Sequence, residues 1–152
     1  MPPRHRWIQL LSSAHRRLQW RLSLEQAQQS APDIAAPTAA QAAVLLLLAQ
    51  SDGASMGQLA QAMDLVPSAV SGLVQRMQQH GWVNQSRCTT DNRTQRVWLL
   101  DAGRLQLPAI QRALKHLNTE LTNGFSSQEL ATVARWLRHV QQLPAPLPLT
   151  FD

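Results

Sequence analysis

The stretch SMGQLAQAMDLVPSAVSGLVQRMQQHGWV, residues 55–83, has the pattern of two short helices joined by a tight turn. Ser55 and Gln58 form a capping-box pattern, in which a serine and a glutamine three residues later satisfy free backbone amides at a helix start. The pattern predicts a helix that begins there and ends at about Met63. Asp64–Val66 is then expected to form the turn.

The second helix is expected to span Pro67–His80, because proline suits the first helical position and Gly81 suits the position after the last. Its apolar residues recur at helical spacing and are predicted to be buried: Val70, Leu73, Val74 and Met77. The outer residues are small, polar and uncharged: Ser68, Ala69, Ser71, Gly72, Gln75 and Gln79. Hydroxyls and amides without negative charge fit the base edges and phosphates of DNA, and the alternative is an ordinary solvated face. A glycine inside a helix costs about 1 kcal/mol relative to alanine, so Gly72 suggests close approach to DNA or to a neighbouring helix.

Two short extended segments, Trp82–Arg87 and Arg96–Leu100, follow, and the polar loop Cys88–Gln95 between them predicts a β-hairpin. A hairpin directly after the second helix makes a winged helix-turn-helix, and Trp82 and Trp98 are expected to pack this wing onto the helices. Three arginines gather in the hairpin: Arg87, Arg93 and Arg96. An arginine at a loop tip suits a narrow minor groove, whose negative potential is enhanced. The alternative is a charged loop that meets only solvent.

Helices are predicted on the N-terminal side of this segment. An apolar stripe indicates a helix over Trp7–Leu24, and the Gln-, Ala-, Ser- and Pro-rich stretch Gln26–Pro37 suggests a linker. A capping-box pattern at Thr38–Gln41 opens a helix that ends at about Gln50. Because this helix is apolar nearly all round, we expect it to be central.

Helices are also predicted after the hairpin. Asp101 is expected to cap one helix, which Pro108 would kink near its start. A further capping-box pattern, Ser126–Glu129, opens a last helix that ends at about Leu143. The predicted fold class is therefore mainly α with a small β-hairpin wing, an α+β winged helix-turn-helix flanked by N- and C-terminal helices.

Length and composition fit one globular domain, and the excess of basic residues suits a polyanionic partner, although many basic proteins bind nothing acidic. The 152 residues suffice for a core without metal or disulfide staples. Fourteen Lys and Arg against nine Asp and Glu give a formal net charge of +5, which suits nucleic acid. No apolar run approaches the roughly 18 residues of a membrane span. The lone Cys88 excludes an intrachain disulfide and agrees with a cytoplasmic location.

Other kinds of site have little support in the sequence. The five histidines and Cys88 show no metal-ligand spacing, and we expect neither a metal nor a cofactor. No nucleophile–base motif or Gly-rich phosphate loop is present, so no enzymatic activity is expected. Oxidation of Cys88 would disturb the wing, although an ordinary thiol is the alternative. Trp20 lies off the main stripe of its helix and is a candidate for a ligand pocket or for a contact with a second copy.

Four segments of the chain resemble motifs of the MarR (multiple antibiotic resistance regulator) family of transcription regulators. Thr38–Gln41 resembles the family's LTxxQ motif, and Gln58–Ala60 resembles its eLA motif. Val70–Val83 resembles the recognition helix and its exit. Asp91–Gly103 resembles the wing motif DxRxxxvxLTxxG. The wing motif is the most specific of these. Asp101 departs from it by standing where the family usually has threonine.

The resemblance implies a ligand-responsive repressor that binds a pseudo-palindromic operator as a homodimer. The whole chain, 1–152, would be one MarR-like domain, with a DNA-binding lobe at 38–103 and a helical dimerisation region at 5–25 and 104–143. Residues implied to contact DNA are Ser68, Ser71, Gln75, Arg76, Arg87, Arg93 and Arg96, with Asp91 orienting the wing. Many family members release DNA when a small anionic aromatic effector binds. The alternative is a winged-helix protein-interaction module without an operator.

Overall fold

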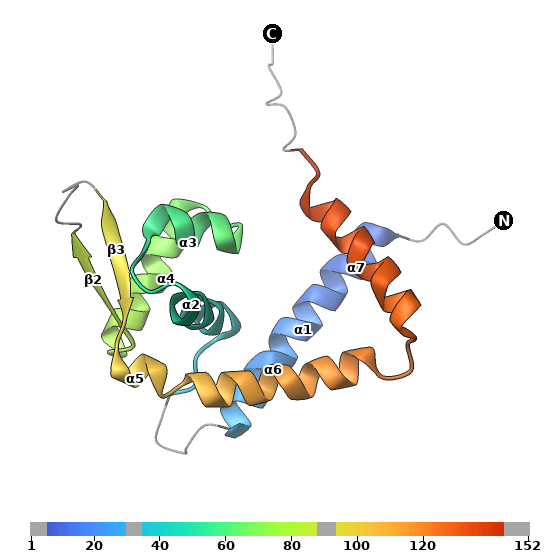
Figure 1. Cartoon of the computed structure of the whole chain (residues 1–152), viewed down its shortest axis with the longest axis horizontal. Coiled ribbons are helices and arrows are strands. Elements are labelled where there is room, and N and C mark those ends of the chain that lie inside the picture. Colours follow the sequence, from blue (N-terminus) through green and yellow to red (C-terminus); the bar gives the residue numbers. More distant parts are fainter. Residues whose placement is uncertain (1–5, 30–34, 88–93, 145–152) are drawn as a thin grey trace, which may run out of the picture. The chain divides into compact units, whose positions relative to one another are not determined.

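The computed structural model describes residues 6–29, 35–87 and 94–144, which form two compact units, residues 1–117 and residues 118–152 (Figure 1). The first unit opens with α1, Trp7–Gln29. The predicted linker from Gln26 onward is therefore wrong over its first residues, which continue the helix. The physical reason is that Gln and Ala favour helices, and no helix breaker occurs before Pro32.

Helix α2, Ala39–Gln50, is the centre of the first unit, as its apolar sequence predicts. The Thr38 hydroxyl accepts from the Gln41 amide at 3.3 Å, and the Gln41 side chain accepts from the Thr38 amide at 2.8 Å. The helix contacts α1, α3, α4, α5 and β3, so several elements bury its sides. Its fully buried side chains include Val44, Leu45 and Leu48.

The helix-turn-helix predicted from residues 55–83 is present as α3, Met56–Met63, and α4, Pro67–Gln79. Ser55 and Gln58 form the reciprocal capping bonds at 2.8 and 3.1 Å. Asp64 ends α3 in the left-handed region, with φ of 53°. Gly81 follows α4 with φ of 68°, a conformation that glycine adopts without steric cost.

The wing has one more strand than the sequence predicted. Strands β2, Val83–Arg87, and β3, Gln95–Leu99, pair antiparallel as expected, with Val83 opposite Leu99 and Arg87 opposite Gln95. The extra strand β1, Ala54–Ser55, adds to the other edge of β3, giving the order β1-β3-β2. Two residues are too few for a period to show in the sequence.

The region after β3 corrects a second prediction. Asp101 does not cap a helix; it is the first residue of the short helix α5, Asp101–Arg104, and Leu100 precedes it without a side-chain cap. A separate helix α6, Leu107–Thr122, replaces the expected kink. The physical reason is Pro108, whose ring would clash with the carbonyl of Arg104 four residues earlier if the helix were continuous.

Residues 118–152 form the second unit, whose main element is α7, Ser127–Gln141. Ser126 and Glu129 close the predicted capping box at its start. None of the α7 side chains is fully buried, and Val133 and Leu137 are exposed. Among the described residues, every helix is too short or too polar to cross a membrane.

The core of the first unit lies between α2, α3, α4 and the wing. It contains the four apolar residues predicted for the inner face of α4, together with Trp82, Val83, Val97 and Leu99 from the region of the wing. Because residues from α4, β2 and β3 share this core, the wing is attached to α4 through packed side chains.

Candidate nucleic-acid interface

The outer face of α4 is a continuous polar surface. Its exposed residues are Ser68, Ala69, Ser71, Gln75, Arg76 and Gln79, whereas Val70, Leu73, Val74 and Met77 are buried. Pro67–Gln79 contains no acidic residue, and Arg76 adds a positive charge to its last turn. An exposed helix with hydroxyls, amides and a cation suits contact with a polyanion.

Gly72 lies on this face with open space beside it. A Cβ added there would meet only the Arg76 guanidinium, at 3.5 Å, which is ordinary van der Waals contact. No neighbouring helix among the described residues therefore requires a glycine at this position. Of the two explanations offered by the sequence, close packing against another helix is wrong.

The hairpin arginines occupy different environments. Arg87 is exposed at the end of β2, where the Gln85 side chain donates to the side chain of Gln95 on the opposite strand. Arg96 is half-buried, and its guanidinium donates to the carbonyl of Gly53 at 2.8 Å. Asp91, Arg93 and Cys88 lie outside the described residues.

The two tryptophans of the wing pack differently. Trp82 is almost wholly buried in the core and stacks on His80 with ring centroids 4.4 Å apart. Trp98 is 41% exposed, and its ring covers Gly53 while its indole N–H donates to the Ser86 hydroxyl at 2.9 Å. Both rings thus hold the wing, Trp82 from inside and Trp98 from the surface.

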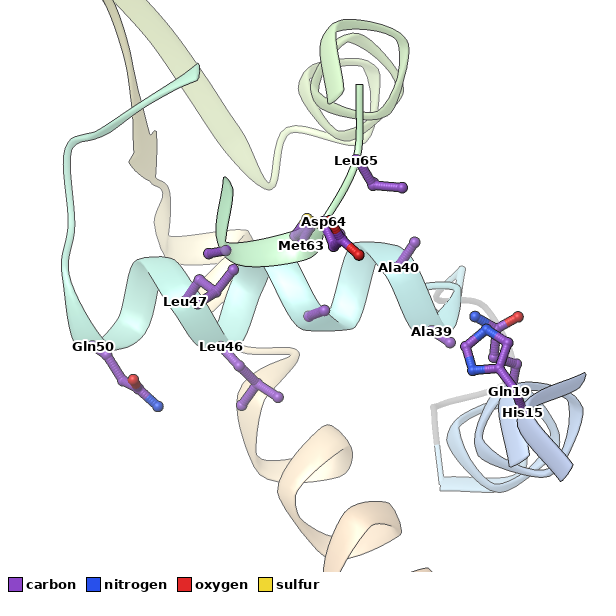
Figure 2. A pocket seen from close by; sticks show the side chains of 12 residues that line it. His15, Gln19, Ala39, Ala40, Leu46, Leu47, Gln50, Met63, Asp64 and Leu65 are labelled. Carbon is purple, nitrogen blue, oxygen red and sulfur yellow. The ribbon is translucent and has the colours of Figure 1, made fainter. Parts of the chain in front are cut away.

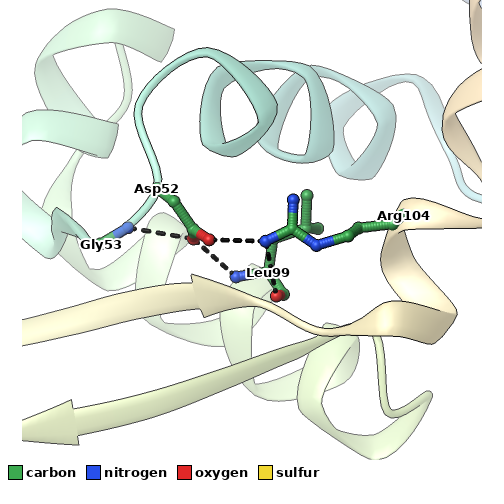
Figure 3. A network of polar contacts seen from close by, with 4 residues as sticks. All are labelled: Asp52, Gly53, Leu99 and Arg104. Atoms are coloured by element: carbon green, nitrogen blue, oxygen red, sulfur yellow. Dashed lines mark hydrogen bonds and ion pairs between the residues drawn. The ribbon is translucent and has the colours of Figure 1, made fainter.

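A polar network that sequence reasoning missed joins the root of the wing to the turn after α2 (Figure 3). One oxygen of the Asp52 carboxylate accepts from the Gly53 amide at 3.1 Å and from the Leu99 amide at 2.8 Å. The other accepts from the Arg104 guanidinium at 2.8 Å. The sequence had indicated Asp52 only as part of a helix-ending turn, because its partners lie 47 and 52 residues away in the chain.

A pocket of about 700 Å³ lies between α1, α2 and the end of α3 (Figure 2). Its polar lining residues are His15, Gln19, Gln50 and Asp64, and the rest of its lining is alanine, leucine and methionine. Met63, Asp64 and Leu65 also form the chain that leads into α4. A molecule bound in this pocket would therefore contact the segment that leads into α4, the helix of the candidate interface.

Trp20 lies beside a second, smaller pocket. That pocket has a volume of about 370 Å³ and is lined also by Arg16, Gln19 and Ser23 of α1 and by the start of α2. The Trp20 side chain is 64% exposed. Within the described ranges, no group of three His, Cys, Asp or Glu side chains is arranged to hold a metal ion.

The MarR family model matches residues 38–94, which include the helix-turn-helix and strand β2 and end just before strand β3. No significant match is found among curated protein sequences. The matched segment coincides with the candidate interface.

Solved structures with the same fold cover nearly the whole chain. The transcriptional regulator SlyA has a TM-score of 0.79 at 17% identity, over 90% of this chain and 92% of that one. A mutant MarR from E. coli, complexed with operator DNA, has a TM-score of 0.77 at 23% identity, with coverages of 90% and 92%. PcaV from Streptomyces coelicolor, in complex with its natural ligand, has a TM-score of 0.70 at 22% identity, with coverages of 84% and 89%.

Proposed function

We propose that this chain is a transcription regulator of the MarR family, which binds a pseudo-palindromic DNA operator as a homodimer and acts as a ligand-responsive repressor. The observation that carries the proposal is the outer face of α4, which is exposed and polar and has no acidic side chain. A helix of this kind after a helix-turn fits the DNA major groove. The proposal includes no catalytic role.

The proposed DNA contacts divide into base-reading and phosphate-binding residues. Ser71 and Gln75 lie on the exposed side of α4, where an amide suits adenine and a hydroxyl suits several bases. Ser68, Arg76 and Arg87 would contact phosphates. From the sequence, we also propose that Arg93 contacts the minor groove and that Asp91 orients it. Because Arg96 is held against Gly53, we assign it to bracing the wing.

The homodimer is supported by exposed apolar residues on the terminal helices. On α1, Trp7, Ile8 and Leu10 are more than half exposed, and α7 exposes Val133 and Leu137. Contiguous exposed apolar patches mark protein interaction surfaces. Two copies joined through these helices would present their α4 helices to successive major grooves, about one helical turn apart.

The test is selection of bound duplexes from a random-sequence pool, followed by affinity measurement at several salt concentrations. We expect a two-fold symmetric consensus, bound with a Kd on the order of nanomolar at moderate salt. Gln75→Ala should change the preferred base at one position of each half-site. Gln61→Ala, an exposed glutamine on α3, is the matched control and should leave the consensus unchanged. Weak binding that vanishes as salt rises, with no consensus, would favour the protein-interaction module.

The pocket lined by α1, α2 and the end of α3 is the proposed effector site. Its volume is within the range of small-molecule sites, and its named lining residues include no lysine or arginine. This lining favours an aromatic effector without a net negative charge over an anionic one. Trp20, beside the smaller pocket, remains a secondary candidate.

The effector proposal is tested with a matched pair of probes, 2-naphthol and 2-naphthoate. We expect 2-naphthol to raise the Tm of the protein and to weaken DNA binding more than 2-naphthoate does. Ala43→Trp, which fills the pocket, should abolish the response to 2-naphthol. A stronger response to the carboxylate would contradict the proposed chemistry of the site.

A further inference from the structure

We infer that Asp52 is a positioning residue for DNA binding, whose carboxylate fixes the wing, strands β2 and β3, relative to the recognition helix α4. The inference rests on the proposed function. Asp52 itself lies in the turn after α2 and is not among the proposed DNA contacts. It acts through the backbone of Leu99 and through Arg104, as Figure 3 shows.

The first step is that the Asp52 carboxylate replaces a missing strand neighbour of β3. Amides of successive residues in a strand point to opposite sides. The Leu100 amide donates to the Trp82 carbonyl on the β2 side, so the Leu99 amide points to the β1 side. Strand β1 begins at Ala54, opposite Val97, and therefore does not extend as far as Leu99. The Asp52 carboxylate accepts the Leu99 amide at 2.8 Å instead.

The second step is that the same carboxylate holds the segment that leaves the wing. Arg104, the last residue of α5, donates to the second oxygen of Asp52 at 2.8 Å. The guanidinium is also 3.5 Å from the Leu99 carbonyl. One carboxylate therefore joins the turn after α2, the end of β3 and the end of α5. Charge-assisted bonds of this kind are shorter and stronger than neutral ones.

The third step is that a small rotation at the root of the wing displaces its far end by a much larger distance. Val83 and Leu99 pair at the root of the wing, and Arg87 and Gln95 pair at its far end. Four residue steps along a strand span about 13 Å, so a rotation of about 10° at the root displaces the far end by about 2 Å. Such a displacement is enough to remove a side chain from a DNA phosphate, since functional groups must be held within about 0.5 Å and 10–20°.

The experiment compares Asp52→Asn with wild type on a duplex selected by the wild-type protein from a random pool. Removing a negative charge would by itself strengthen DNA binding. A loss of affinity would therefore mean that the position of the wing has changed. We expect binding to weaken about tenfold and the log–log salt slope to fall by about 1, because a phosphate contact of the wing is lost. Measurements are made well below the Tm of each variant, so that only folded protein is compared.

Two controls separate positioning from charge and from stability. Asp101→Asn makes the same change of charge at the exposed start of α5 and should bind as wild type or slightly tighter. Arg104→Gln should weaken binding as Asp52→Asn does, and Arg104→Lys, which keeps the charge, should restore most of the affinity. A purely structural role would leave the salt slope of the folded variants unchanged.

A double-mutant cycle with Arg87→Ala tests whether Asp52 acts through the wing. If it does, the double variant should bind within about twofold of Arg87→Ala alone, because the wing contact is lost in both. Fully additive losses would overturn the inference, as would wild-type affinity for Asp52→Asn. A wild-type protein that selects no duplex would overturn the proposed function and the inference with it.

Discussion

At the residue scale, two structural constraints favour glycine at position 53: a positive φ and the closeness of the Trp98 ring. Gly53 turns the chain with φ of 76° between α2 and β1, and the Trp98 ring lies where a side chain would be. A Cβ at this position would be 2.5 Å from the ring. The same residue offers its carbonyl to Arg96. A larger residue would therefore disturb both the turn and the bracing of the wing.

Gly53→Ala is predicted to lower the free energy of unfolding by about 3 kcal/mol, from left-handed backbone strain plus overpacking against Trp98. Gly81→Ala is the matched control, because Gly81 also has a positive φ but has open space beside it. That change should cost about 1 kcal/mol, from backbone strain alone. Urea unfolding of both variants is the measurement, and equal losses would contradict the role of the Trp98 ring.

At the element scale, α4 combines a buried apolar face with an outer face that is kept free of acidic groups. Its helical stability is not optimised, because Gly72 lies in its middle. Among the described residues, no neighbouring group packs so closely against Gly72 that it requires a glycine there. A glycine that weakens a helix without serving its packing is best explained by what the helix binds.

Gly72→Ala is predicted to raise the free energy of unfolding by about 0.5–1 kcal/mol, because alanine restricts the unfolded chain and favours the helix. The same change should weaken DNA binding, because the added methyl occupies the surface that approaches the duplex. Thermal unfolding and DNA affinity are measured on the same preparation. A more stable protein with unchanged affinity would show that DNA does not approach Gly72.

The start of α7 depends on the charge of Glu129. Backbone and side-chain hydrogen bonds from Ser126 hold the pKa of the Glu129 carboxyl below its ordinary value of 4.5. A lowered pKa means that the charged form stabilises the helix start above about pH 4.5 and that this stabilisation is lost as pH falls through the lower, folded-state pKa.

Ser126→Ala is predicted to raise the pKa of Glu129 part of the way toward its ordinary value, because the change removes the hydroxyl that donates to the carboxylate and keeps the backbone N–H that also donates to it. The measurement is an NMR titration of the Glu129 side-chain carboxyl in the two proteins. An identical titration curve in the variant would mean that the capping box does not form in solution.

At the scale of the whole molecule, exposed apolar groups on α1 and α7 remain to be covered. If these groups form the proposed dimer interface, Val133→Glu combined with Leu137→Glu should convert the dimer to a monomer and weaken operator binding strongly. A monomer places only one α4 on the duplex. Light scattering gives the oligomeric state. Leu105→Glu, a change at a 78% exposed leucine between α5 and α6, is the control and should leave the dimer intact.

The starts of α2, α3, α4 and α7 and the exposed face of α4 can be predicted from the sequence alone. Three capping boxes, Pro67 and Gly81 act on neighbours within about four residues, so their effects can be predicted locally. Apolar spacing predicted the buried face of α4, and two short extended segments around a polar loop predicted the pairing of β2 with β3. The break between α5 and α6 also has a local cause, because Pro108 acts on Arg104 four residues earlier.

Only the tertiary structure decided how the wing is held. The Asp52 bonds to Leu99 and Arg104 and the Arg96 bond to Gly53 join residues 43 to 52 positions apart. Strand β1 forms because it pairs with a free edge of β3. A sequence of two residues is too short to predict such a strand. Such contacts depend on which surfaces meet after the helices have packed, and no spacing along the chain encodes that outcome.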